Sequence, residues 1–92
     1  MSETLELRPE VAAFAQAMER KLRENDHKGG WKDEDVWALF TRLRKDETAE
    51  LVSAVYSYQH DGSPGCVLDE AADVANFCLM IADVCGALEP TG

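Results

Sequence analysis

Apolar residues recur every three or four positions along most of the chain, which is the period of helices that bury one face. The first such run predicts a helix that starts near Arg8-Pro9 and ends before Asn25-Asp26. Proline suits the first turn of a helix because the N–H that it lacks has no partner there. Adjacent glycines at Gly29 and Gly30 then predict a loop over residues 25–32.

A second helix is predicted from Asp33, as its N-cap, to the turn over residues 61–65. Its inward stripe, with steps of three or four residues, comprises Val36, Phe40, Leu43, Glu47, Glu50, Ala54 and, as a further candidate, Tyr58. Two glutamates therefore stand where apolar residues are expected. A break in this helix within residues 33–45 is an open alternative.

A third helix is predicted from Cys66 or Val67 to Val84 or Cys85, with Gly86 as its stop. Beyond Glu70 its only polar side chains are Asp73, Asn76 and Asp83. A helix that is apolar nearly all round must be buried nearly all round, and two partner helices from so small a chain cannot cover it. No strand pattern competes. We therefore predict an all-α bundle completed by dimerisation, or a dimer of dimers.

Composition narrows the classes of partner. The 92 residues suit a single domain over residues 1–92, with a net charge of −9 and no run of basic residues. This charge argues against a nucleic-acid polymer or an anionic membrane as partner. The N-terminus has no basic region, so it is not expected to be a signal peptide. Three cysteines without CxxC spacing predict reduced thiols in the cytoplasm, with Cys78 and Cys85 as small core residues.

One acidic pattern occurs twice, in residues 46–52 and again 23 positions later in residues 69–75. Each copy places two carboxylates three residues apart on one helix face, Glu47 with Glu50 and Glu70 with Asp73. Helices joined by a short loop run antiparallel, so the four acids are expected to converge. Two like charges about 4 Å apart repel by roughly 4 kcal/mol at an effective dielectric near 20. Oxygen-only ligands favour Mg²⁺ or Mn²⁺ as the neutralising ion. A solvated acidic face is the alternative.

The spacing of these four acids resembles the motif of the MazG-like all-α nucleotide pyrophosphohydrolases, over residues 27–85. The resemblance implies that Glu47, Glu50, Glu70 and Asp73 are catalytic and bind two or three Mg²⁺ or Mn²⁺ ions. It also implies hydrolysis of a nucleoside triphosphate to the monophosphate and pyrophosphate. The homodimer or homotetramer is expected from the apolar third helix, not from the resemblance. One departure is Asp46, where the family often has glutamate.

A narrower likeness involves residues 27–31 and residues 73–77. These segments are similar to phage-type dATP/dGTP diphosphohydrolases, the MazZ group. The likeness implies a purine deoxynucleotide as substrate and, for a viral protein, the host cytoplasm as location.

Four residues are candidates for substrate binding. Lys28 lies beside two glycines that let a ligand approach the backbone, and it is a candidate phosphate contact. His27 is a candidate for phosphate or sugar, and Trp31 for stacking on a purine, unless it anchors the loop. Asn76 needs partners on an apolar helix: a sugar hydroxyl, a phosphate, a carboxylate that it orients, or a structural hydrogen bond. The bases before the first acidic pair are assigned to a solvated face, with contact of one of them with the leaving pyrophosphate as the alternative: Arg42, Arg44 and Lys45.

Three other functions stay open from the sequence. The first is an enzyme of the same superfamily that acts on dUTP, dCTP or phosphoribosyl-ATP. The second is a non-catalytic helical module that binds metal or a protein partner. The third is a plain helical bundle with a solvated acidic stripe.

Overall fold

The computed structural model describes residues 4–88 and contains helices and turns without strands over that range. The elements are α1 (Pro9–Glu24), a 3₁₀ turn η1 (Asp26–Lys28), α2 (Val36–Arg42), a π-helical turn η2 (Leu43–Glu47), α3 (Thr48–Asp61) and α4 (Gly65–Val84). The prediction of an all-α fold is confirmed. Residues 1–3 and 89–92 lie outside the described residues. The predicted domain includes both segments, and the expectation that the N-terminus is not a signal peptide concerns the first of them.

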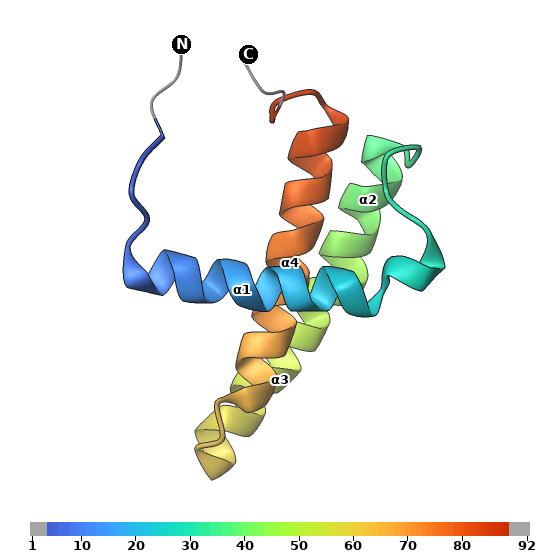
Figure 1. Cartoon of the computed structure of the whole chain (residues 1–92). Helices are drawn as coiled ribbons and strands as arrows, with labels where there is room; N and C mark the ends of the chain where they lie inside the picture. The colour runs from blue at the N-terminus through green and yellow to red at the C-terminus, as the bar shows by residue number, and fades with distance from the viewer. Residues whose placement is uncertain (1–3, 89–92) are drawn as a thin grey trace.

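Helix α4 is the centre of the fold, because α1, α2 and α3 all pack against it. Helix α1 crosses α4 at a steep angle, whereas α2, η2 and α3 follow one another along its length (Figure 1). The predicted bounds of α1 are confirmed, with Pro9 in its first turn and Asn25 at its C-cap. This crossing brings the last two turns of α1 against the middle of α4, at Asn76 and Asp73.

The second predicted helix is wrong in two respects. Its N-cap is Asp35, not Asp33, and the Asp35 carboxylate accepts a hydrogen bond from the Ala38 N–H at 3.1 Å. The second difference is the π turn of five residues at Leu43–Glu47, which interrupts the α-helical period. The alternative of a break in the helix is therefore the better description.

The π turn changes which residues face the core. A π turn accommodates one extra residue. Relative to a straight α-helix through Glu47, each residue before the turn therefore points where the next residue in the sequence was expected to point. Leu39, with 1% of its surface exposed, is buried in place of the predicted Phe40, which is 39% exposed. Beyond the turn the predicted stripe holds at Ala54, which is buried, and fails at Tyr58, which is exposed.

Helices α3 and α4 form an antiparallel hairpin (Figure 1). Gly62 ends α3 in the left-handed conformation with φ 74°, and the Ser63 N–H donates to the Asp61 carboxylate at 2.8 Å. The predicted bounds of the last helix are confirmed to within a residue, and Gly86 follows its end with φ 81°. The antiparallel arrangement of these two helices places the acidic residues of α3 opposite those of α4.

The core of one chain is small. The buried apolar residues of the described range are Ala17, Leu39, Ala54, Ala72 and Phe77. All three cysteines are exposed, so the prediction that Cys78 and Cys85 are core residues is wrong for the single chain. Three buried alanines and two larger buried side chains leave much of the apolar surface of α2, α3 and α4 uncovered. Within the described residues, no helix is long and apolar enough to span a membrane.

Candidate metal and nucleotide site

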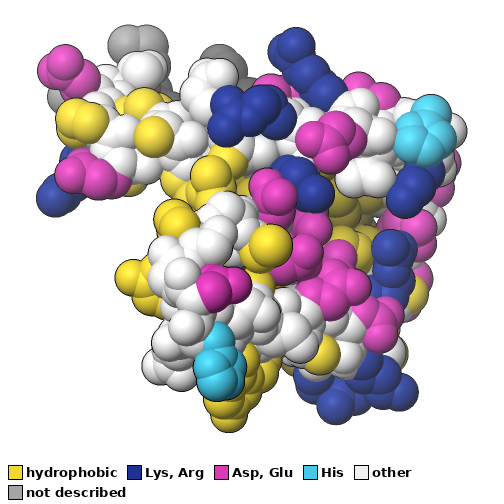
Figure 2. Space-filling model, turned by 90° about the horizontal axis from the view of Figure 1, so that it is seen from below, with side chains coloured by type: hydrophobic (Ala, Val, Ile, Leu, Met, Phe, Trp, Pro, Cys, Tyr) yellow, Lys and Arg dark blue, Asp and Glu magenta, His cyan; other side chains and the backbone are white. Residues whose placement is uncertain are grey.

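Three carboxylates from two helical segments share one place in the fold. Glu47 ends the π turn, Glu50 lies in the first turn of α3, and Asp73 lies on the facing side of α4. One carboxylate oxygen of each lies within 4.8 Å of the other two. We call Glu47, Glu50 and Asp73 the acid cluster. Figure 2, which shows the molecule from below, shows acidic side chains gathered beside a hollow with a basic side chain among them.

Glu70, the fourth predicted ligand, lies one turn before Asp73 on α4 and adjoins the cluster without belonging to it. Its Oε2 atom is buried and has no hydrogen-bond partner in the structure. An unpaired buried carboxylate oxygen is costly, and a cation or a proton would relieve that cost. The structure thus brings three of the four predicted acids within mutual reach, with the fourth beside them.

The acids resist ionisation. Burial, a hydrogen bond with the Glu50 carboxyl and the charges of Glu50, Asp73 and Glu70 raise the pKa of Glu47 to about 7. Burial first, and then the charges of Glu50 and Asp73, raise the pKa of Glu70. Burial likewise raises the pKa of Asp73, although Lys21 opposes the shift. Ionising these carboxyls together is therefore unfavourable, and a bound divalent cation would offset that cost.

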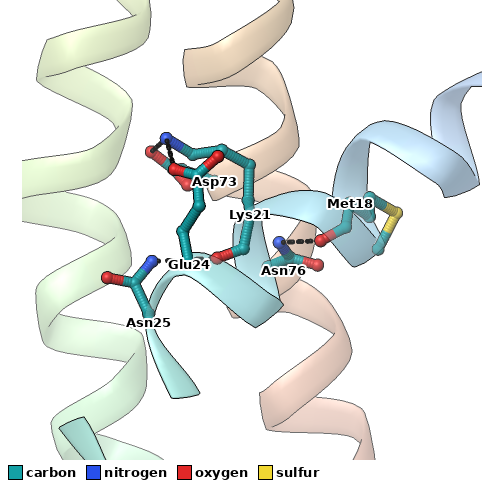
Figure 3. A network of polar contacts seen from close by, with 6 residues as sticks. All are labelled: Met18, Lys21, Glu24, Asn25, Asp73 and Asn76. Carbon is teal, nitrogen blue, oxygen red and sulfur yellow. Dashed lines mark hydrogen bonds and ion pairs between the residues drawn. The ribbon is translucent and has the colours of Figure 1, made fainter. Parts of the chain in front are cut away.

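Lys21, on α1, contacts the acid cluster through Asp73. Its Nζ lies 3.7 Å from Asp73 Oδ2 and 3.8 Å from Glu24 Oε1 (Figure 3). Burial lowers the pKa of Lys21, but the charges of Asp73, Glu24, Asp69 and Glu70 outweigh it and raise the pKa overall. Lys21 is not among the site residues predicted from the sequence. Its position one helical turn before Asn25 offered no indication that α1 would cross α4 at the acids.

A cleft of about 340 Å³ opens beside the cluster. Glu47 and Asp73 of the acid cluster line it, and the rest of the wall comes from α1, α2, α4 and the loop after α1. Its lining residues include three bases, Lys21, Lys28 and Arg42, and two further acids, Asp26 and Glu34. The cleft therefore offers both carboxylates, which suit a divalent ion, and bases, which suit phosphate.

The predicted substrate residues of the loop divide into two groups. Lys28 and Trp31 line the cleft, whereas His27 is exposed and does not line it. The Trp31 Nε1–H donates to Asp83 Oδ2 at 2.9 Å, and Lys32 pairs with the same oxygen. Trp31 thus anchors the loop to the end of α4, as the alternative for this residue anticipated, while it still borders the cleft. These two donors lower the pKa of Asp83.

Arg42 was assigned to a solvated face, and the structure gives it a further contact. Its side chain is exposed, yet the guanidinium carbon lies 4.9 Å from the centre of the Phe77 ring. Stacking on an aromatic ring holds the arginine at the rim of the cleft. The π turn that begins at the next residue made this placement invisible to a straight helical period.

Asn76 is buried, with 3% of its surface exposed, and it lines the cleft. Its Nδ2 donates to the Met18 carbonyl at 3.0 Å, while its Oδ1 is buried without a partner (Figure 3). The structural hydrogen bond anticipated from sequence is therefore present, and one acceptor is left over. An acceptor attracts a donor, so a phosphate, which has no proton to offer when ionised, is a poor match for Oδ1.

The raised pKa values predict that the metal-free protein is less stable at pH 8 than at pH 5.5. A carboxyl with a raised folded pKa stabilises the fold below its unfolded value near 4.5, and this contribution is lost as pH rises through about 7. Each kcal/mol lost lowers Tm by about 4–8 °C for a chain of this size. We expect Mn²⁺ to restore Tm at pH 8 more than at pH 5.5 in thermal melts.

The matched control for these melts is Glu47→Gln, which removes the group with the largest shift. This variant should show a flatter dependence of Tm on pH between 5.5 and 8. If Glu47→Gln and the unmodified protein lose the same Tm over this range, the acid cluster is not the source of the pH dependence.

Comparisons of the chain with protein-family models, with curated proteins and with solved structures found no match.

Proposed function

We propose that the protein hydrolyses a nucleoside triphosphate to the monophosphate and pyrophosphate, with Mg²⁺ or Mn²⁺ held by the acid cluster. The observation that carries this proposal is the convergence of Glu47, Glu50 and Asp73 at the wall of a cleft. An acidic patch alone would not support it. Two unpaired buried acceptors, Glu70 Oε2 beside the cluster and Asn76 Oδ1 in the cleft wall, independently call for a ligand.

Charge balance supports a divalent ion. Lys21 is the base paired with the acid cluster among residues 4–88, and one ammonium group cannot neutralise four neighbouring carboxyls. The ligands are all oxygen atoms, which suit Mg²⁺ or Mn²⁺ better than Zn²⁺. Glu47, Glu50 and Asp73 would hold the ion, and Glu70 is placed to complete its shell or to orient a water molecule.

The bound ion would supply a water molecule of lowered pKa and would neutralise the charge of the phosphates. Water attacks the α-phosphorus, the bond to the bridging oxygen breaks, and pyrophosphate leaves. A carboxylate of the acid cluster takes the proton of the attacking water. Phosphoryl transfer asks for little beyond positioning and charge neutralisation, and the bases Lys28 and Arg42 in the cleft wall are candidates to hold the phosphates.

Asn76 is proposed to bind the sugar. With Nδ2 occupied by Met18, the free Oδ1 accepts a hydrogen bond, and a sugar hydroxyl is the donor that a nucleotide brings nearest to its phosphates. We predict that removing the 3′-hydroxyl, as in dideoxyguanosine triphosphate, raises KM about tenfold for the unmodified protein.

In Asn76→Ala, the KM values for dGTP and its dideoxy analogue should become similar, because the acceptor is gone. The quantity to compare is the ratio of KM for the dideoxy analogue to KM for dGTP, in the unmodified protein and in the variant. A general loss of stability from the broken Met18 contact affects both KM values alike, so it cancels in this ratio. An unchanged ratio in Asn76→Ala would contradict the sugar contact.

The chain is proposed to act as a homodimer with the MazG-like bundle completed between subunits. It exposes 7115 Å², whereas a compact monomer of 10.2 kDa exposes about 5,300 Å². Subtracting the most that the residues outside 4–88 can contribute, about 1,100 Å², still leaves an excess of about 700 Å². Hiding this area on each subunit gives a total near 1,400 Å², which lies within the range of stable specific interfaces.

The apolar residues that a partner would cover lie largely on α3 and α2. On α3, Val52, Val55 and Tyr56 are exposed at spacings of three and four, so they share one face. Trp37 and Phe40 on α2 are also exposed and pack against each other, with ring centres 5.4 Å apart.

Exposed reduced thiols at all three cysteines suit the cytoplasm, which we propose as the location.

The proposed activity is tested by incubating the purified protein with Mg²⁺ or Mn²⁺ and each common nucleoside triphosphate, including dGTP, dATP, dUTP and dCTP. We expect pyrophosphate and a monophosphate as products, with a preference for a purine deoxynucleotide. Preference for dUTP or dCTP would retain the chemistry and change the substrate. Failure to turn over any nucleotide with either ion would favour a non-catalytic module.

A further inference from the structure

Lys21 is the one base whose ion pair reaches the acid cluster among residues 4–88. The other ion pairs of this range join Arg23 to Glu19 and Lys32 to Asp83, away from the cluster. The Lys21 side chain is 22% exposed and that of Asp73 is 21% exposed, so their contact is shielded from bulk water on most sides. Shielding makes such a pair stronger than one on the open surface.

The position of Lys21 conflicts with a cation at the cluster. Asp73 Oδ2 accepts the contact with Lys21 Nζ at 3.7 Å, and an oxygen of Asp73 lies within 4.8 Å of those of Glu47 and Glu50. A divalent ion bound by these oxygens would therefore face an ammonium group across one carboxylate. Two cations at such a separation repel, and the repulsion falls if the ammonium moves away.

The Lys21 side chain can move from the acid cluster to another part of the cleft. This side chain lines the cleft together with Lys28 and Arg42, the two bases proposed to hold the phosphates. The ammonium is carried on a flexible four-carbon stem that can change rotamer while its backbone stays fixed. The backbone of Lys21 is held by α1, and its carbonyl accepts a hydrogen bond from Asn25 Nδ2 at 3.0 Å (Figure 3).

We propose that Lys21 is an exchangeable counter-ion: it occupies the acid cluster when metal is absent, and it moves to a phosphate of the substrate when metal is bound. The inference rests on the proposed function, because it requires the cluster to bind a divalent ion. It assigns Lys21 two opposite effects. The lysine competes with the metal in the free protein, and it strengthens the binding of phosphate in the loaded protein.

The test measures both effects in Lys21→Met, which keeps the length of the side chain and removes its charge. Calorimetric titration of Mn²⁺ into the nucleotide-free variant should give an affinity about three- to tenfold higher than that of the unmodified protein. Titration of inorganic pyrophosphate into the Mn²⁺-saturated variant should give an affinity at least about tenfold lower. A merely structural role would weaken both or neither, so opposite changes identify the exchange.

Two further variants complete the experiment. Lys21→Arg keeps the charge and should stay near the unmodified protein in Mn²⁺ affinity. Arg23→Met removes one positive charge two residues along the same helix, where the arginine pairs with exposed Glu19 at 3.0 Å. Arg23→Met should leave both affinities unchanged, which controls for net charge.

The outcomes separate this inference from the proposed function. If the unmodified protein binds Mn²⁺ and Lys21→Met binds it no more tightly, the counter-ion role is overturned while the metal site stands. Equal pyrophosphate affinity in the two proteins overturns the second role. If the unmodified protein binds no Mn²⁺ at the cluster, both the proposed function and the counter-ion role of Lys21 are contradicted.

Discussion

Replacing Glu50 by Gln or Asp73 by Asn is expected to abolish turnover while the helical fold persists. Each variant keeps the shape of the side chain and removes one charged ligand of the acid cluster. Even residues that only support metal ligands typically cost about 10–100-fold in affinity or activity when they are changed. Loss of a ligand itself should therefore lower kcat by more than about a hundredfold.

The same variants should be more stable than the unmodified protein when metal is absent. Asp73 has a raised pKa because of burial, with Lys21 opposing and Glu50 adding to the shift, so its charged form opposes folding. Removing a negative charge from Glu50 relieves the repulsion that also raises the pKa of Glu47 and Glu70. Thermal melts in a chelator at pH 8 should show a higher Tm for Glu50→Gln, and the advantage should vanish with saturating Mn²⁺.

Asp69→Asn is the control for these variants. Asp69 is an exposed carboxylate on the same helix as Asp73 and lies outside the acid cluster. The change has the same effect on net charge, and turnover should remain close to that of the unmodified protein. Normal turnover in Glu50→Gln or Asp73→Asn would refute the assignment of the site.

Val52→Asp is expected to convert the protein from a dimer to a monomer. Val52 is 54% exposed in the single chain, so aspartate there meets only water in a monomer. In a dimer that covers the face of Val52, Val55 and Tyr56, the same aspartate would be buried without a partner. Burying an unpaired charge costs several kcal/mol, which corresponds to a loss of at least about a hundredfold in association.

Light scattering at micromolar concentration measures this change directly. The unmodified protein should have about twice the chain mass of 10.2 kDa, and Val52→Asp should have a mass near 10.2 kDa. Ser57→Asp is the matched control, because Ser57 is exposed on a different face of α3 and its substitution should leave the dimer intact. A monomeric unmodified protein, or a dimeric Val52→Asp, would contradict the proposed interface.

The sequence predicted the elements of the fold well because their boundaries have local causes. Pro9, Asn25, Gly62 and Gly86 each start or stop a helix through their own backbone chemistry, and the structure has the helix ends there or within a residue. Periodicity also placed Ala54 on the buried face correctly. These features need no knowledge of contacts between distant residues.

The π turn shows where periodicity fails. A pattern of steps of three and four fits a straight helix through Phe40 and Leu43. The sequence around Leu43–Glu47 carries no signal that predicts an extra residue in that turn. Tertiary packing decides the matter, because burying Leu39 and still turning Glu47 toward Asp73 requires a change of phase between them. The convergence of Glu47, Glu50 and Asp73 was thus predicted from a helix geometry that is incorrect in detail.

Contacts of α1 were the largest omission. Lys21 and Met18 meet Asp73 and Asn76 across more than 50 residues of sequence. Their spacing within α1 is that of an ordinary amphipathic helix, so the sequence gives no reason to connect them with the acids. Only the crossing of α1 over α4 shows that a base stands at the acid cluster and that one end of the Asn76 amide is already occupied.

The proposed function depends above all on a divalent ion bound between Glu47, Glu50 and Asp73. Anomalous diffraction from crystals soaked in Mn²⁺ at pH 8 tests this most directly. We predict an anomalous peak within bonding distance of oxygens from all three carboxylates, about 2.0–2.2 Å away, with Lys21 Nζ withdrawn from Asp73. An empty cluster in crystals that bind Mn²⁺ elsewhere, or that bind none, would contradict the central claim.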